Sequence, residues 1–198
     1  MNKNLKGNVN SKILVIGCFH GDEPQGKYLI DEYLKIKPNT QLLFIPCLNE
    51  YGFIHNTRTN SNGVDLNRNF PTKNWILSEK DNFYGGESPA SEEETKFIID
   101  IIEKNEPDLI LTLHAPYKVV NYDGNAEEIS EKISEIMHYP VEKSIGYPTP
   151  GSFGTWAGIE RNLPTITLEL DEECPMEELK EPVFKVFELL ENQSTNAI

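Results

Sequence analysis

The sequence is poor in cysteine. Its three cysteines, Cys18, Cys47 and Cys174, are odd in number and widely spaced, and no two of them form a C-x-x-C motif. Such a set argues against a disulfide framework and against a thiolate metal site. Reduced thiols are therefore the simplest interpretation.

Long hydrophobic runs are also missing. The longest apolar stretches are short, strand-like segments such as 13–17, well below the roughly 18 residues that a membrane span needs. The N-terminal segment leads into only that short stretch and then into charged residues, so the hydrophobic region of a signal peptide is not found there. We expect a cytoplasmic protein that does not span a bilayer.

Basic residues are scarce relative to acidic ones. The chain has 32 acidic side chains against 18 lysines and arginines, which gives a formal net charge of −14. A strongly negative protein is repelled by the phosphate backbone of nucleic acids and by anionic membranes. Neither is expected as a partner.

What is present describes a globular α/β domain. Hydrophobic residues make up 38% and charged residues 25% of 198 residues, and we expect one domain spanning 1–198. Apolar patterning predicts strands that alternate with helices, which favours an α/β sandwich around a central sheet. The predicted strands cover 12–17, 41–46, 108–114 and 165–170, and the predicted helices cover 25–37, 126–137 and 176–191.

Two further segments carry local signals. Ser91 followed by Glu94 is typical of a capping box and predicts a helix that runs to Lys104 and stops before Pro107. The polar stretch 48–71 has no clear periodicity and predicts a long loop. Loops of that length in compact domains are usually functional.

The first candidate site is the H-x-x-E motif of His20 and Glu23, where a strand ends. His114 ends another predicted strand. Sheets of this class collect ligands at strand ends, so these side chains can meet. Two histidine nitrogens and one carboxylate are the ligand set of a catalytic zinc. A loop histidine beside a surface acid, and a structural histidine at 114, are the alternatives.

The second candidate is Glu169. Alternation in the strand 165–170 places Thr165, Thr167 and Glu169 on one face and aliphatic residues on the other. An edge strand with one face in water would give the same pattern. The functional alternative is a general base beside a metal site.

The third candidate is a pair of arginines, Arg58 and Arg68, that lie ten residues apart among amide side chains. Arginine is the residue best suited to hold a carboxylate through two parallel hydrogen bonds. A solvated loop with incidental arginines is the alternative.

Taken in order, these motifs resemble a known family. The set H-G-D-E, G-V-D-L-N-R-N-F-P, a lone histidine after a strand and T-L-E-L is similar to the zinc carboxypeptidases related to carboxypeptidase A. It is most similar to the small bacterial murein peptide amidases, which hydrolyse the bond between γ-D-glutamate and meso-diaminopimelate. The resemblance covers about 12–170 and implies a three-layer sandwich with a central, mostly parallel mixed sheet.

The resemblance also implies roles for the metal site. His20, Glu23 and His114 correspond to the ligands of one zinc ion per chain. Glu169 corresponds to the general base that takes a proton from water at the zinc and passes it to the leaving amine. Asp22 stands beside the ligand pair, where an acceptor that orients one of the histidines would lie.

The substrate residues follow in the same way. Arg58 corresponds to the arginine that polarises the scissile carbonyl, and Asn67 with Arg68 to the pair that holds the substrate's terminal carboxylate. Tyr147 matches the family's mobile tyrosine over the substrate. Two positions depart from the amidase pattern: Asp171 replaces a usual proline, and His55 stands where some relatives have arginine.

These implications lead to one functional expectation with two alternatives. We expect a cytoplasmic zinc metallopeptidase that trims a murein tripeptide with a free C-terminal carboxylate. The first alternative is a carboxypeptidase or an aspartoacylase-type amidohydrolase acting on another small acidic peptide or N-acyl amino acid. The second is a non-catalytic, zinc-dependent peptide-binding relative, which would need neither Glu169 nor Arg58.

Overall fold

The computed structural model describes residues 4–143 and 148–195. The strands are β1 (Lys6–Gly7), β2 (Ile13–Gly17), β3 (Leu43–Ile45), β4 (Leu109–His114), β5 (Val119–Asp123), β6 (Val141–Glu142) and β7 (Thr165–Glu169). The α-helices are α1 (Gln25–Ile36), α2 (Glu50–His55), α3 (Glu93–Asn105), α4 (Glu127–Met137) and α5 (Met176–Thr195). A 3₁₀ turn, η1 (Leu66–Arg68), and a π-helical turn, η2 (Thr155–Ile159), complete the set.

Within the described residues the strands form one seven-stranded sheet in the order β1-β3-β2-β4-β7-β5-β6. The central strands β3, β2, β4 and β7 are parallel, whereas β1 pairs antiparallel with β3 and β5 pairs antiparallel with β7. The expectation of a mostly parallel mixed sheet is confirmed. β7 lies inside the sheet between β4 and β5, so the alternative of an edge strand at Glu169 is wrong.

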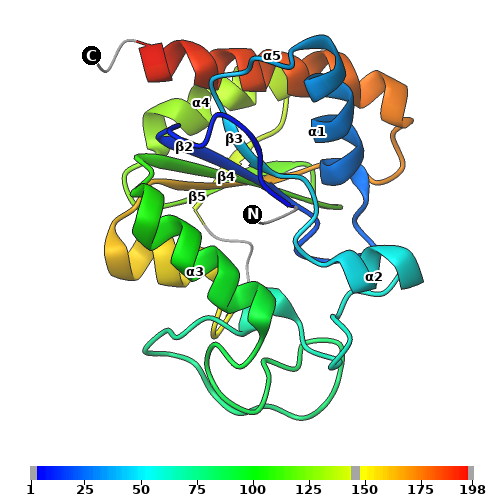
Figure 1. The fold of residues 1–198 in the computed structure, drawn as a ribbon, viewed down its shortest axis with the longest axis vertical. Coiled ribbons are helices and arrows are strands. Elements are labelled where there is room, and N and C mark those ends of the chain that lie inside the picture. Colours follow the sequence, from blue (N-terminus) through cyan, green and yellow to red (C-terminus); the bar gives the residue numbers. More distant parts are fainter. Residues whose placement is uncertain (1–3, 144–147, 196–198) are drawn as a thin grey trace.

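Helices cover both faces of this sheet (Figure 1). Helices α1, α4 and α5 lie on one face, and α3 with η2 lies on the other. Each face has its own apolar core. Val15 and Leu111 pack toward Phe187 of α5, whereas Ile16 and Ile98 belong to the cluster that contains Trp156 of η2.

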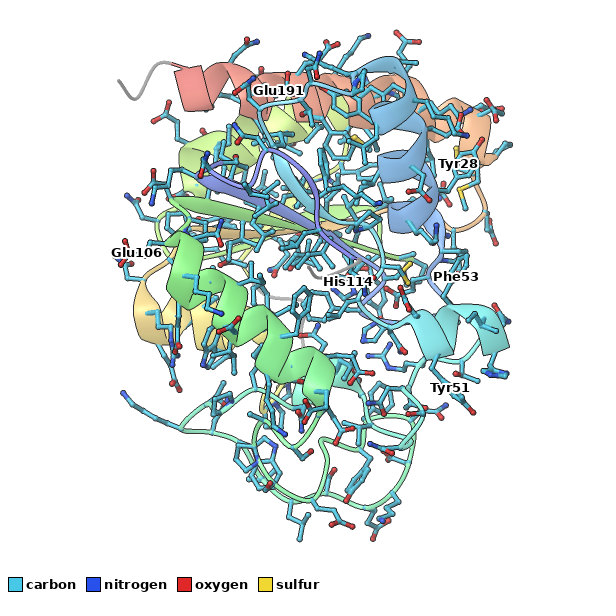
Figure 2. All side chains as sticks on the ribbon, in the orientation of Figure 1. Tyr28, Tyr51, Phe53, Glu106, His114 and Glu191 are labelled. Carbon is cyan, nitrogen blue, oxygen red and sulfur yellow. The ribbon has the colours of Figure 1, made fainter. Side chains whose placement is uncertain are left out.

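Alternation along β4 decides which side chains reach which face. Leu109, Leu111 and Leu113 belong to the core under α1, α4 and α5. The intervening residues, which end with His114, therefore point to the opposite face. Figure 2 shows His114 on the side of α2 and the long connecting segments, away from Glu191 on α5.

Two local expectations are wrong. The stretch 48–71 contains α2 and η1 instead of being a continuous loop. Helix α3 begins at Glu93 after the N-cap Glu92, and the Ser91 hydroxyl donates to the Glu92 carboxylate instead of capping the helix. The Ser91 oxygen accepts a hydrogen bond from Asn69 Nδ2 at 2.9 Å instead of from a helix N–H, so the predicted capping box does not form.

Candidate active site

The candidate residues meet at the carboxyl ends of the central strands. β2 ends at Gly17, and the chain continues directly to His20 and Glu23. β4 ends at His114, which is paired with Glu169 at the end of β7. Parallel neighbours end at the same edge of a sheet, so the topology brings three distant segments together.

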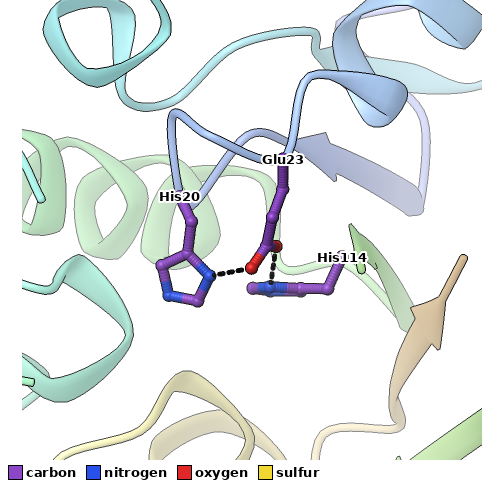
Figure 3. Close-up of side chains that lie close together, drawn as sticks. All are labelled: His20, Glu23 and His114. Carbon is purple, nitrogen blue, oxygen red and sulfur yellow. Dashed lines mark hydrogen bonds and ion pairs between the residues drawn. The ribbon is translucent and has the colours of Figure 1, made fainter. Parts of the chain in front are cut away.

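His20, Glu23 and His114 form a compact group (Figure 3). His20 Nδ1 lies 2.7 Å from Glu23 Oε1, and His114 Nδ1 lies 3.0 Å from Glu23 Oε2. One ligand atom from each of the three side chains lies within 4.8 Å of the other two. The structure therefore brings the predicted ligand set together.

This group fits a zinc ion by its donor chemistry and by its surroundings. Two imidazole nitrogens and one carboxylate converge in a largely buried place, as in catalytic zinc sites. The second ring nitrogen of His20, Nε2, lies 3.0 Å from Asp65 Oδ1. Metal-binding histidines are usually oriented in this way by a carboxylate on their other nitrogen.

The electrostatics of the group favour a cation. Burial alone would lower the pKa of His20, but the carboxylates of Asp65 and Glu23 outweigh it and raise the pKa to about 9. Burial raises the pKa of Glu23 and of Asp65, yet the neighbouring histidines and, for Asp65, Arg58 hold both well below their usual range. Two ionised carboxylates therefore persist in a buried site.

Asp65 is the functional residue that the sequence interpretation missed. Its side chain is fully buried, and its Oδ2 accepts hydrogen bonds from Nε and NH2 of Arg58 at 3.0 and 2.8 Å. Its Oδ1 also accepts from the Asn67 backbone N–H at 2.8 Å, which caps η1. The expectation for Asp22 is wrong, because that side chain is exposed and makes no hydrogen bond within the described residues. The sequence feature that could have pointed to Asp65 is an aspartate directly before Leu66–Arg68, because aspartate is a preferred N-cap residue.

The two arginines line one cavity of about 470 Å³ together with the histidines and Glu169. Asp65 orients Arg58, and Arg58 NH1 lies 3.7 Å from Glu23 Oε1. Arg68 is almost buried and stands 5.9 Å from the ring centre of Phe83. No carboxylate in 4–143 or 148–195 lies within ion-pair distance of Arg68, whose NH1 donates to the Asn67 carbonyl at 2.6 Å and whose charge helps to lower the pKa of Asp65. The solvated-loop alternative is therefore wrong.

Asn67 also lines the cavity, and its Oδ1 accepts a hydrogen bond from the Phe153 backbone N–H at 2.9 Å. This bond orients the side-chain amide, whose N–H groups donate to no acceptor within the described residues. Tyr147 lies outside the described residues. Of the two positions that depart from the amidase pattern, Asp171 pairs with Lys118 at 2.7 Å, and the ring of His55 lies 4.3 Å from that of Tyr51, tilted by 41°, at the exposed end of α2.

Glu169 lines the same cavity as the arginines. Its side chain is buried, and its Oε2 has no hydrogen-bond partner within the described residues. Burial raises its pKa, while the nearby His114 opposes the rise. A carboxylate with a raised pKa and a free oxygen is suited to accept a proton and to return it.

The layered fold and the His/Glu/His group at the carboxyl ends of its central strands are typical of metal-dependent hydrolases. Residues 1–144 match the zinc carboxypeptidase family. Murein peptide amidase A of Escherichia coli is 31% identical over 93% of this chain and 81% of its own length, and that of Vibrio campbellii is 32% identical over 81% and 70%. The crystal structure of murein-tripeptide amidase MpaA from Escherichia coli O157 superimposes with a TM-score of 0.81 at 29% identity, covering 93% of this chain and 82% of that one. The chain belongs to the zinc carboxypeptidase family and is a zinc peptide hydrolase.

Across the described ranges no helix combines the length and the apolar character needed to cross a membrane.

Proposed function

We propose that this protein hydrolyses the γ-D-glutamyl-meso-diaminopimelate bond of a murein tripeptide and binds one zinc ion per chain. The likeness to murein peptide amidase A over 93% of the chain supports the substrate class. The observation that carries the proposal is the single cavity that His20, Glu23, His114, Glu169, Arg58 and Arg68 line together.

His20, Glu23 and His114 would hold the zinc ion. The chemistry that zinc supplies in such a site is polarisation of the scissile carbonyl and a lowering of the pKa of water to about 7. Glu169 takes a proton from the attacking water at its free oxygen and passes it to the leaving amine. Arg58, held by Asp65, donates hydrogen bonds to the oxyanion that develops on the carbonyl oxygen.

Arg68 and Asn67 would hold the terminal α-carboxylate of the substrate. Within the described residues the Arg68 guanidinium has no ion pair, and the Asn67 side-chain N–H groups donate to no acceptor. A carboxylate bound by a guanidinium in a partly closed site gains charge-assisted hydrogen bonds that water competes for poorly. This contact would place the scissile bond between the zinc site and Glu169.

We place the activity in the cytoplasm. Cys18, Cys47 and Cys174 are all free thiols in the structure. Reduced thiols are typical of cytoplasmic proteins, where glutathione and thioredoxin oppose disulfide formation.

A substrate panel tests the proposal directly. Zinc-loaded protein is incubated with L-Ala-γ-D-Glu-meso-diaminopimelate, its C-terminal amide, an α-linked L,L-dipeptide and an N-acyl aspartate, and products are identified by mass. We expect release of diaminopimelate from the free acid and a large loss of kcat/KM for the amide, because the amide cannot neutralise Arg68. Faster cleavage of the α-linked dipeptide or of the N-acyl aspartate would replace the murein assignment by one of the other amidohydrolase activities.

A further inference from the structure

Glu92, directly before α3, is a buried carboxylate that the proposed reaction does not use. Its side chain is 5% exposed, and none of the described cationic side chains lies within ion-pair distance of it. Burial would raise the pKa of Glu92, but hydrogen bonds from Ser91, Asn60 and Asn62 outweigh it and lower the pKa. The side chain makes no capping hydrogen bond to the helix backbone. Its partners, and not the helix, therefore indicate what this charge does.

Two of these donors belong to a closed turn, residues 60–64. Asn60 Nδ2 donates to Glu92 Oε2 at 2.8 Å, and Asn62 Nδ2 donates to the same oxygen at 2.7 Å. Asn60 also closes the turn, because its Oδ1 accepts from the backbone N–H groups of Asn62 at 3.0 Å and Val64 at 3.1 Å. The Glu92 carboxylate therefore holds the turn as a unit.

This turn joins two residues of the candidate active site. Arg58 precedes it and Asp65 follows it, and Arg58 donates two hydrogen bonds to Asp65 at 3.0 and 2.8 Å. The Asp65 backbone N–H donates to the Tyr84 carbonyl at 2.8 Å, which ties the end of the turn to the segment that leads into α3. A displaced turn would move Asp65, and with it the Arg58 guanidinium.

The segment beyond η1 is held at the same place. Asn69, next to Arg68, accepts from the Glu92 backbone N–H at 3.2 Å through its Oδ1. Its Nδ2 donates to the Ser91 hydroxyl oxygen at 2.9 Å, and that hydroxyl donates to Glu92 Oε1 at 2.6 Å. Asn69 is fully buried, so water competes poorly for these bonds. Glu92 is thus linked to the chain on both sides of η1.

We propose that Glu92 is a positioning residue that keeps the guanidinium groups of Arg58 and Arg68 directed into the cavity. Its carboxylate does so by holding the segment 58–69 against the start of α3. Glu92 is not among the described residues that line the cavity, and it takes no part in breaking the bond. The inference rests on the proposed function in one respect, the roles of the two arginines in binding and polarising the substrate.

Two peptides that differ only at the C-terminus test the inference. L-Ala-γ-D-Glu-meso-diaminopimelate and its C-terminal amide are assayed with wild type and Glu92→Ala of verified zinc content. We expect Glu92→Ala to lower kcat/KM for the free acid about 10- to 100-fold and to lose much of the preference for the free acid over the amide, because Arg68 is misplaced. A mere loss of folded protein would lower both rates by the same factor and leave the preference unchanged.

Glu92→Gln is the conservative variant. Its amide oxygen can accept from Asn60 and Asn62 while its N–H donates to the Ser91 oxygen, so kcat/KM and the preference should stay within about threefold of the wild type. Glu93→Ala is the matched control, because Glu93 is exposed in the same turn of α3 and pairs with Lys96 on the surface. It should behave as the wild type.

Three outcomes would overturn the inference. They are an unchanged preference in Glu92→Ala, an equal loss of preference in Glu93→Ala, and a Glu92→Gln variant as impaired as Glu92→Ala. If Glu92→Ala does not fold, Asn62→Ala takes its place, since it removes one of the hydrogen bonds from an exposed side chain. It should then show a smaller loss of preference in the same direction, and no loss would refute the role of Glu92.

Hydrogen exchange separates this inference from the proposed function. Exchange of residues 57–70 is followed by mass spectrometry without substrate, and it should be faster in Glu92→Ala than in Glu92→Gln and the wild type. If the murein tripeptide is not cleaved but the α-linked dipeptide or the N-acyl aspartate is, the murein assignment fails and the preference is tested on that substrate and its amide. If no substrate is cleaved, faster exchange in Glu92→Ala supports the positioning role, and unchanged exchange overturns it.

Discussion

Asp65 joins the metal group to the substrate side of the site through a single carboxylate. One oxygen faces His20 and the other accepts both hydrogen bonds from Arg58. The position of Asp65 therefore fixes both the ring orientation of His20 and the direction of the Arg58 guanidinium. A change at Asp65 should therefore affect metal binding and turnover together.

Asp65→Asn should weaken zinc binding by about 10- to 100-fold, because an amide is a poorer acceptor for the His20 ring N–H. Competition with a fluorescent zinc chelator measures the affinity. Asp22→Asn is the matched control, since Asp22 lines the same cavity but makes no hydrogen bond within the described residues. Equal zinc affinity in Asp65→Asn and the wild type would show that Asp65 does not support the metal.

Glu169→Gln should retain zinc and fold but lose about 10²- to 10⁴-fold in kcat, because an amide can neither accept nor return the proton. Burial of Glu169 and its partnerless oxygen motivate the prediction. Single-turnover assays on protein with verified zinc content are the measurement. Near-normal turnover in such a preparation would remove Glu169 from the mechanism.

The raised pKa of Asp123 should make the stability of the protein depend on pH. Burial raises its folded-state pKa from 3.8 to about 6, so folding favours the protonated form. Its contribution to stability is therefore present below pH 3.8 and is lost as the pH rises through about 6. Asp123→Asn should gain Tm relative to the wild type between pH 4 and pH 7, in thermal unfolding followed by circular dichroism. A difference in Tm that does not change with pH would contradict the raised pKa.

At the level of elements, the predictable parts are those with strong apolar patterns. β2, β4 and β7 are buried strands with continuous or alternating apolar residues, and their ends indicated His20, His114 and Glu169. β5 was not expected, because Asn and Asp interrupt it and only alternate residues are buried. Asp123 lies close to Gly154 because two segments distant in the sequence meet in the fold, and no local sequence pattern predicts such a contact.

Helix α2 was missed for a different reason. It has six residues, and its large apolar side chains Tyr51, Phe53 and Ile54 are exposed, so no apolar stripe marks it. Its start depends on Asn49, whose Oδ1 accepts from the Gly52 backbone N–H at 2.8 Å. Asn49 Nδ2 also donates to the Arg58 carbonyl at 3.1 Å, which ties the helix to the segment that carries this arginine.

Asn49→Ala should lower the free energy of unfolding by about 1–3 kcal/mol, because it removes a helix cap and leaves buried backbone groups without partners. It should also lower kcat by loosening the segment that ends in Arg58. Urea unfolding and initial rates are the two measurements. Thr57→Ala, which alters an exposed hydroxyl on the same segment, should change neither. A loss of stability without any change in kcat would separate the helix cap from the placement of Arg58.

On the scale of the whole molecule, the candidate active site brings charges of both signs together, since Asp22, Glu23, Asp123, Glu169 and Glu172 line the same cavity as three cationic side chains. The chain has a formal net charge of −14, yet Arg58, Arg68 and Lys143 all line the candidate active site. The sequence predicted the net charge and the arginines, whereas the fold was needed to place them in one cavity. That residues 1–198 form a single domain stays a prediction.

This distribution makes the rate of substrate capture sensitive to salt. The diaminopimelate tripeptide carries three carboxylates and two amino groups, so it has one net negative charge and is repelled by the protein at long range. Raising the ionic strength from about 0.01 to about 0.1 M shortens the Debye length from about 30 to about 10 Å. That change screens the long-range repulsion more than the contacts inside the cavity, so kcat/KM for this tripeptide should rise. The peptide L-Ala-γ-D-Glu-L-lysine, in which lysine replaces diaminopimelate, has no net charge. Its kcat/KM should respond much less to salt, which makes it the control in the same assay. A fall in kcat/KM for the anionic tripeptide would instead mean that the local field of the cavity arginines dominates its approach.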